Sequence, residues 1–204
     1  TTQGEDFPFP YPHYHHTHII IFKKLPQVNI PSPPTPKRPK KKHKKALKFD
    51  IQDLLISLHN ARQLNGKMAD VTDYLKGKIK GTKAPHYHGV TEHWGYHQDF
   101  STSTHKWFGI DKPSNRGQHG GVGAFVNNKL AKITHILHEY SNHNIMWLQT
   151  TTETDPIYIA VVYAPPNQDA LLEEIIKSIQ KTLAILSDLG RVLIMGDFNC
   201  RFGH

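Results

Sequence analysis

Apolar residues follow two different periods in the chain after residue 50. Short apolar runs typical of strands alternate with segments in which apolar residues recur every three or four positions, as on one face of a helix. This alternation predicts an α/β domain rather than a helical bundle. The expected strands cover residues 54–59, 87–91, 121–127, 145–151, 157–163 and 191–196, and the expected helices cover 67–78 and 169–186.

The second expected helix has the clearest apolar stripe. Glu173 and Glu174 stand in its first turns, where negative charge is favourable to the helix dipole, and Gly190 marks its end. The strand expected next, 191–196, is almost purely apolar, which indicates a buried position in a sheet. The stripe consists of Leu172, Ile175, Ile176, Ile179, Leu183 and Leu186.

The first 46 residues differ from the rest in composition. Nine of the fourteen prolines precede residue 50, and eight of the twelve residues 37–48 are Lys or Arg. Because proline removes a backbone donor and ends regular structure, we expect a disordered Pro/His/Lys-rich tail over 1–46 and a folded domain over 47–204. The basic run at 37–42 suits nuclear import or phosphate contact, which predicts a nuclear protein, and a solvated charged linker is the alternative.

Charge and cysteine content narrow the class of protein. The net charge of +8 belongs to the tail, since residues 1–50 carry ten Lys/Arg and three acids while residues 51–204 carry fifteen and fourteen. Cys200 is the only cysteine, which excludes disulfide scaffolds and four-cysteine zinc modules. The longest apolar run, 157–164, is far shorter than the ~20 residues of a membrane-spanning helix.

Polar residues capable of chemistry stand at the ends of four expected strands. Asp197 and Asn199 follow the last strand, and Asn60, Glu92 and Tyr163 end earlier ones. If these strands share a sheet, their ends form one rim, where ligands bind in α/β proteins. The alternatives are an ordinary turn at Asp197 and Asn199 and an aromatic residue anchored by its hydroxyl at Tyr163.

These side chains offer oxygen ligands and no thiol. Such a set favours Mg²⁺ or Mn²⁺ over zinc. Magnesium needs only one or two carboxylates together with substrate phosphate, and a carboxylate beside it can orient or deprotonate water. Hydrolysis of a phosphodiester is therefore the chemistry that the residues favour.

Five motifs in order resemble the endonuclease/exonuclease/phosphatase superfamily, and within it the apurinic-endonuclease-like domain of non-LTR retrotransposons. The resemblance covers residues 50–203 and implies a deoxyribonuclease-I-like two-sheet α/β sandwich. It also implies a DNA endonuclease, although lipid phosphatases, sphingomyelinases and deadenylases share the metal-binding core. The motifs are His59-Asn-Ala-Arg-Gln-Leu-Asn65, Val90-Thr-Glu-His-Trp94, His119-Gly-Gly-Val-Gly-Ala-Phe125, Val162-Tyr-Ala-Pro-Pro-Asn167 and Leu193-Ile-Met-Gly-Asp-Phe-Asn199.

The resemblance implies a role for each matched position. Glu92 would ligate Mg²⁺ or Mn²⁺ with Asn60 supporting it, and Asp197 would position or activate the attacking water. Asn199 would hold the phosphate or that water, and Tyr163 would contact the scissile phosphate.

Five further positions complete the expectations for the site. Arg62 and Asn167 would bind the substrate, with DNA as the expected partner. The glycines at 120, 121 and 123 are expected to serve strand geometry, because no Lys-Ser/Thr follows them as in a phosphate-binding loop.

The sequence departs from the family at its C-terminal end. The family has a later Ser-Asp-His segment, whereas this sequence stops at His204, so we expect a partial domain whose second sheet is incomplete. Activity of the isolated chain is thereby left open, as is a following reverse transcriptase domain. The alternatives are a non-catalytic nucleic-acid-binding remnant and a transition-metal binder that uses His86, His88, His93 and His97.

Overall fold

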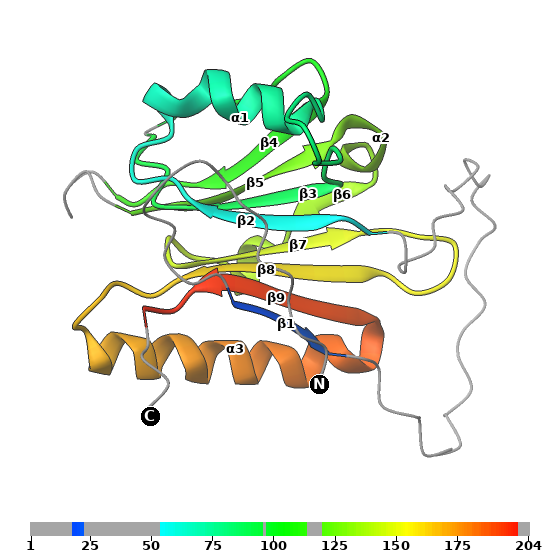
Figure 1. The fold of residues 1–204 in the computed structure, drawn as a ribbon. Helices are drawn as coiled ribbons and strands as arrows, with labels where there is room; N and C mark the ends of the chain where they lie inside the picture. The colour runs from blue at the N-terminus through cyan, green and yellow to red at the C-terminus, as the bar shows by residue number, and fades with distance from the viewer. Residues whose placement is uncertain (1–17, 23–53, 96, 114–119, 200–204) are drawn as a thin grey trace.

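Two β-sheets pack face to face, and a helix covers the outer face of each (Figure 1). The structure is a computed structural model that describes residues 18–22, 54–95, 97–113 and 120–199, with backbone only for 18–22. The layers are therefore helix, sheet, sheet and helix. This is the deoxyribonuclease-I-like α/β sandwich that the resemblance implied.

The first sheet has the order β2-β3-β5-β4. Its parallel pair, β2 and β3, ends at the same edge, and β5 runs antiparallel to both β3 and β4. Helix α1 (Met68–Leu75), preceded by the 3₁₀ turn η2 (Asn65–Lys67), lies on its outer face. The strands are β2 (Ile56–Asn60), β3 (Tyr87–Thr91), β4 (His105–Ile110) and β5 (Val122–Asn127).

The second sheet has the order β1-β9-β8-β7-β6. Its parallel pair, β8 and β9, is connected through α3 (Asp169–Leu189), which covers the outer face. The remaining elements are β1 (His18–Phe22), β6 (Thr134–Ile136), β7 (Ile145–Thr150), β8 (Ile157–Tyr163), β9 (Arg191–Asp197), α2 (Asn128–Ala131) and η4 (His138–Tyr140). None of the helices in the described ranges has the length and apolarity needed to span a membrane.

The main core lies between the two sheets. Alternate residues of the facing strands point into it, because successive side chains of a strand point to opposite faces. Val122, Ala124 and Val126 of β5 line it from one sheet and Ile159 and Met195 from the other. The strand expected at 121–127 is therefore confirmed, and the alternation of its side chains fixes which of them reach the gap between the sheets.

The expected strands and helices are all present, with boundaries shifted by a few residues. The first helix is shorter than 67–78 because the chain turns at Gly77, whose φ is 66°. In the stripe of α3, Ile175, Ile179 and Leu186 are buried, but Ile176 is 41% exposed, so the expectation was wrong for that residue. Three strands and one α-helix of the described residues had not been expected from the pattern, namely β1, β4, β6 and α2, and neither had the 3₁₀ turn η4.

Strand β1 lies within the segment expected to be disordered. It pairs antiparallel with β9, from His18 opposite Gly196 to Phe22 opposite Val192. The disorder expected over 1–46 therefore does not hold for these five residues. An isoleucine run between prolines suits an edge strand, whose outer side needs no further pairing. The basic run at 37–42 lies outside the described residues.

Candidate functional site

The strand ends that carry the expected site residues converge where the two sheets meet. In the first sheet Asn60 is paired with Thr91, directly before Glu92. In the second sheet Tyr163 is paired with Asp197. Each of these pairs closes the carboxyl end of a parallel strand pair, so the apolar layer between the sheets ends in polar side chains.

The Asn60 amide connects the two carboxylates. Its Nδ2 donates to Glu92 Oε1 at 2.9 Å and to Asp197 Oδ2 at 2.6 Å. The carboxylates are therefore within two hydrogen-bond lengths of each other, although 105 positions separate them in the sequence. The Oδ1 atom of Asn60 is buried and accepts no hydrogen bond within the described part of the chain. The result is a half-buried cluster of oxygen atoms with one free acceptor.

The Tyr163 hydroxyl belongs to the same cluster. Burial raises its pKa above the ordinary value, and the neighbouring Glu92 carboxylate, to which the hydroxyl donates, raises it further. Asp197 acts in the same direction, and Arg62 opposes the shift. The phenol is therefore protonated at neutral pH and serves as a hydrogen-bond donor.

The Glu92 backbone has an unusual conformation held by its neighbours. Its φ is 54°, in the left-handed region that glutamate seldom adopts. The Glu92 N–H donates to the Gly121 carbonyl, and its own carbonyl accepts from Gln63. Left-handed backbone persists where the surroundings enforce it, and it is common at functional sites. Here it turns the carboxylate towards Asn60.

Asn199, Arg62 and Asn167 surround this cluster less closely. The Asn199 Nδ2 donates to the Ala164 carbonyl, and its backbone N–H donates to Asp197 Oδ1. Arg62 is exposed and near enough for its charge to lower the pKa of the Tyr163 hydroxyl. Asn167 is exposed in the loop after β8, and within the described part of the chain no hydrogen bond joins it to the other expected site residues. All three have positive φ, as Glu92 does.

Two polar residues at the site were not expected from the sequence. Thr91 is fully buried, and no described residue pairs with its Oγ1. Asn144 holds Tyr163 in place, since its Nδ2 donates to the Tyr163 carbonyl and its own carbonyl accepts from the Tyr163 N–H. Thr91 could have been predicted from its position next to Glu92 at the end of a strand. Asn144 stands in a turn, and nothing in the sequence indicated that it belongs to the site.

The histidines proposed as an alternative metal site do not form one. Both nitrogens of His93 are used, because Nδ1 accepts from the Gly95 N–H and Nε2 faces the Ile110 carbonyl at 3.2 Å. His88 is buried and bonds Ser57, whereas His86 accepts from Leu55. Among the described residues, no group of three or more His, Cys, Asp or Glu side chains is arranged to hold a metal ion.

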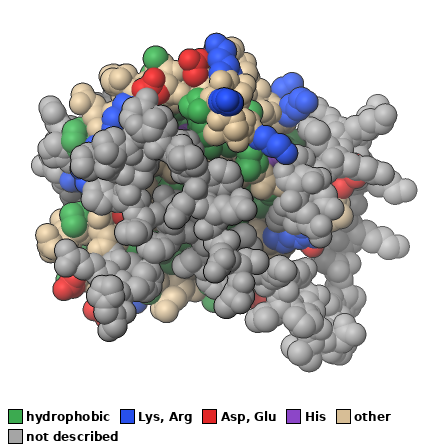
Figure 2. All heavy atoms as spheres, viewed as in Figure 1, with side chains coloured by type: hydrophobic (Ala, Val, Ile, Leu, Met, Phe, Trp, Pro, Cys, Tyr) green, Lys and Arg blue, Asp and Glu red, His purple; other side chains and the backbone are tan. Residues whose placement is uncertain are grey.

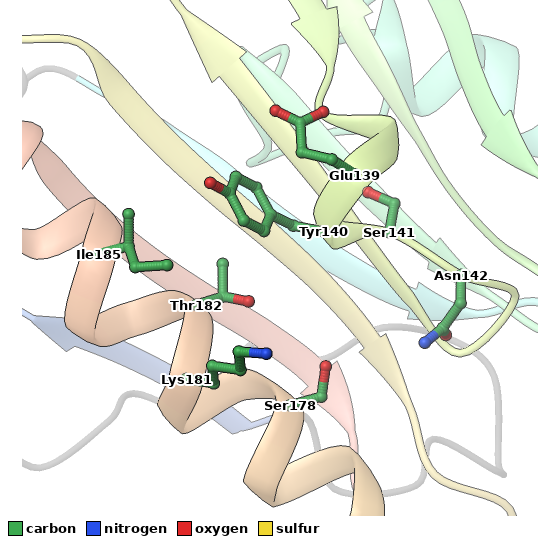
Figure 3. A pocket seen from close by; sticks show the side chains of 8 residues that line it. All are labelled: Glu139, Tyr140, Ser141, Asn142, Ser178, Lys181, Thr182 and Ile185. Atoms are coloured by element: carbon green, nitrogen blue, oxygen red, sulfur yellow. The ribbon is translucent and has the colours of Figure 1, made fainter.

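The hollows of the described residues lie away from the candidate site. One of about 250 Å³ lies between η4 and α3, where Tyr140 faces Lys181 and Thr182 (Figure 3). None of the expected site residues lines it.

The sheet order and the two parallel pairs are those of a deoxyribonuclease-I-like fold. Solved structures share this fold. The endonuclease domain of TRAS1, a telomere-specific non-LTR retrotransposon, matches with a TM-score of 0.50 and 15% identity over 72% of this chain and 60% of that chain. A humanized D. rerio TDP2 with 14 mutations matches with a TM-score of 0.51 and 12% identity over 73% and 63%.

These likenesses show the fold, and the resemblance expected from the five motifs is confirmed at that level. The chain spans 60% of the length of the TRAS1 domain and 63% of that of the TDP2 structure. No protein-family model matches the sequence, and no curated protein is significantly similar to it.

Proposed function

We propose that this domain hydrolyses phosphodiester bonds in DNA with the help of Mg²⁺ or Mn²⁺. The observation that carries the proposal is the Asn60 amide, which joins Glu92 and Asp197 across the two sheets. The shared fold with a retrotransposon endonuclease domain supports the choice of DNA and of endonucleolytic cleavage.

The donor atoms of the site fit a hard divalent cation. Glu92 supplies a carboxylate and Asn60 a buried amide oxygen that has no other described partner. Magnesium is held by one or two carboxylates together with waters and substrate phosphate, so these two residues are sufficient protein ligands. A bound cation would offset charge on the phosphoryl oxygens and lower the pKa of water.

The residues of the chain divide the remaining tasks. Asp197 is 6% exposed at the strand end and holds the position from which a carboxylate orients water and accepts its proton. The Tyr163 hydroxyl, protonated because its pKa is raised, keeps Glu92 oriented. Asn199 uses one amide hydrogen on Ala164 and keeps the other for a phosphate oxygen. Arg62 and Asn167, both exposed at the rim, contact the neighbouring phosphates.

Nicking of supercoiled plasmid in the presence of Mg²⁺ tests this proposal. We expect nicking by the parent chain and a fall of at least roughly 100-fold in Glu92→Gln and in Asp197→Asn, since each removes a charge at the reacting centre. Lys177→Gln, on α3 and exposed, is the control and should nick like the parent. Salt-sensitive DNA binding without nicking by the parent would instead identify a non-catalytic nucleic-acid-binding domain.

A further inference from the structure

Lysines gather at the end of the sandwich opposite the candidate site. Seven of the thirteen described Lys and Arg residues fall in 76–83, at 106 and in 128–132, and these segments contain no acidic residue. Figure 2 shows Lys and Arg side chains grouped at the upper right, over the C-terminal end of α1 and over α2. The lysine surface consists of Lys76, Lys78, Lys80, Lys83, Lys106, Lys129 and Lys132, all exposed.

Strand register brings these segments together. Val126 in β5 is paired with Tyr87 on one side and Lys106 on the other, so the start of β3 and the start of β4 lie at the same edge. The Asn127 N–H donates to the His86 carbonyl and the Asn128 N–H to Thr104. The lysine surface therefore lies beyond the amino end of β3, whereas Glu92 follows its carboxyl end. The length of β3 separates the two, roughly 15 Å.

The charges of this surface are largely uncompensated. Within the described residues Lys78 is the one member with an ion pair, to Asp73 at 3.2 Å. Lys106 lies 5.2 Å from the Phe108 ring centroid and within the field of Asp99. Lys106 and Lys132 also line one hollow of about 410 Å³, together with Asn128 and Ala131. Two ammonium groups on one hollow repel each other unless an anion lies between them.

We infer that this lysine surface binds the phosphate backbone of a nucleic acid, as a second site separate from the hydrolytic rim. The inference rests on the proposed function for its class of ligand. Lysine ammonium groups act as point charges towards phosphate, and such contacts give affinity without reading sequence. The roughly 15 Å between the lysine surface and Glu92 is more than the spacing of neighbouring phosphates along a strand, so the surface contacts phosphates other than the one at the rim.

Nucleic acid fits this surface better than a membrane. Peripheral membrane binding combines basic residues with apolar side chains that enter the lipid. The large hydrophobic residues exposed in the described part of the chain are Leu55, Ile176, Ile185 and Leu189. The last three lie on α3, and Leu55, which is bonded to His86, is the one that borders the lysine surface. A single apolar side chain beside seven lysines does not make the apolar face that enters lipid.

The test measures binding of a labelled 20-base-pair DNA duplex by fluorescence anisotropy across a range of salt concentrations, with a chelator present so that hydrolysis does not interfere. The full chain is compared with Lys106→Gln/Lys132→Gln and with Lys177→Gln/Lys181→Gln, which removes the same charge from α3. We expect the first variant to bind several-fold more weakly. Its slope of log affinity against log salt should fall by about 0.9 for each phosphate that the variant no longer neutralises. The α3 variant should match the parent.

Equal binding by both variants would overturn the inference. The inference would also be overturned if Lys106→Gln/Lys132→Gln lost binding to phosphatidylserine vesicles while its duplex binding stayed unchanged, because the surface would then bind a membrane. Mg²⁺-dependent hydrolysis of bis(p-nitrophenyl) phosphate by the same variants separates this inference from the proposed function. If the first variant hydrolyses the ester and binds the duplex as the parent does, only the inference about the lysine surface is refuted. If the parent does not hydrolyse the ester but the first variant binds the duplex more weakly, only the proposed hydrolytic function is refuted.

Discussion

At the scale of single residues, two buried polar atoms without a described partner lie at the candidate site. Asn60 Oδ1 and Thr91 Oγ1 are both buried, and no described atom bonds either of them. The two residues are register partners at the end of the parallel pair β2 and β3. A buried polar atom without a hydrogen bond destabilises a fold by about 1–3 kcal/mol. We interpret these oxygens as acceptors kept free for ligands at the expense of stability.

Thr91→Val tests this interpretation through stability. Valine has nearly the same shape and lacks the hydroxyl, so the penalty of the unpaired Oγ1 disappears. We expect the free energy of unfolding to be unchanged or to rise by about 1 kcal/mol in urea denaturation without divalent ions.

Thr150→Val is the matched control for this substitution. Its hydroxyl is equally buried but bonds the Tyr87 hydroxyl at 2.6 Å and Thr134 Oγ1 at 2.8 Å. Its removal takes two hydrogen bonds from buried groups, although Thr134 Oγ1 keeps its bond to the Leu130 carbonyl, and should destabilise by about 1–3 kcal/mol. Equal destabilisation by both substitutions would mean that Thr91 has a partner in solution.

At the scale of elements, the start of β5 sets the position of Glu92. Gly121 has a φ of 84° and accepts the Glu92 N–H, while Gly120 accepts the Trp94 N–H. A Cβ on Gly121 would lie 2.4 Å from His93 Nε2. The glycines expected to serve strand geometry do so here, and through that geometry they hold the turn that carries the carboxylate.

Gly121→Ala should therefore disturb both stability and chemistry. We expect a loss of at least about 2 kcal/mol, from the left-handed backbone and the contact with the buried His93 ring together, and reduced plasmid nicking. Thermal unfolding and the nicking assay measure the two effects. Gly66→Ala is the control, because nothing lies within 4 Å of its added Cβ. If Gly121→Ala proves as harmless as Gly66→Ala, the glycines before β5 do not hold Glu92 in place.

Largely apolar runs and a one-sided apolar stripe were predictable from the sequence. The runs of β5, β8 and β9, which are almost wholly buried, and the stripe of α3 gave the right type and nearly the right bounds. Strand β4 was not predicted because Trp107 on one face packs with the α1 cluster while Phe108 on the other packs with the main core. Apolar and polar residues therefore do not alternate in it. Ile176 fits the helical period but lies at the margin of the face that the sheet covers.

At the scale of the whole molecule, buried histidines make the fold sensitive to acid. Burial lowers the pKa of His88 to about 3 and that of His59 to about 4, and it also lowers the pKa of His105. In the unfolded chain a histidine titrates near 6.5. As the pH falls below 6.5, these histidines bind protons in the unfolded chain but stay neutral in the folded one. The stability present above pH 6.5 is therefore progressively lost.

For His88 this linkage amounts to about 2 kcal/mol between pH 6.5 and 5. We expect the free energy of unfolding, measured by urea denaturation, to fall more steeply over this range in the parent than in His88→Phe. Phenylalanine keeps an aromatic ring beside Phe125 and does not titrate. Parallel pH profiles for the two proteins would show that His88 is accessible to protons in the folded state.

The sequence by itself determined the class of fold and most of the strands, and it named the residues of the candidate site. Local apolar periodicity reports which face of each element is covered, and polar residues at strand ends show where a sheet edge carries chemistry. The contacts of the site depend on pairing between distant segments. Only the tertiary structure joined Glu92 to Asp197 through Asn60 and showed that the buried hydroxyl of Thr91 beside them has no described partner. It also brought lysines from separate segments together at the opposite end. The reason is that sheet register is set by long-range packing.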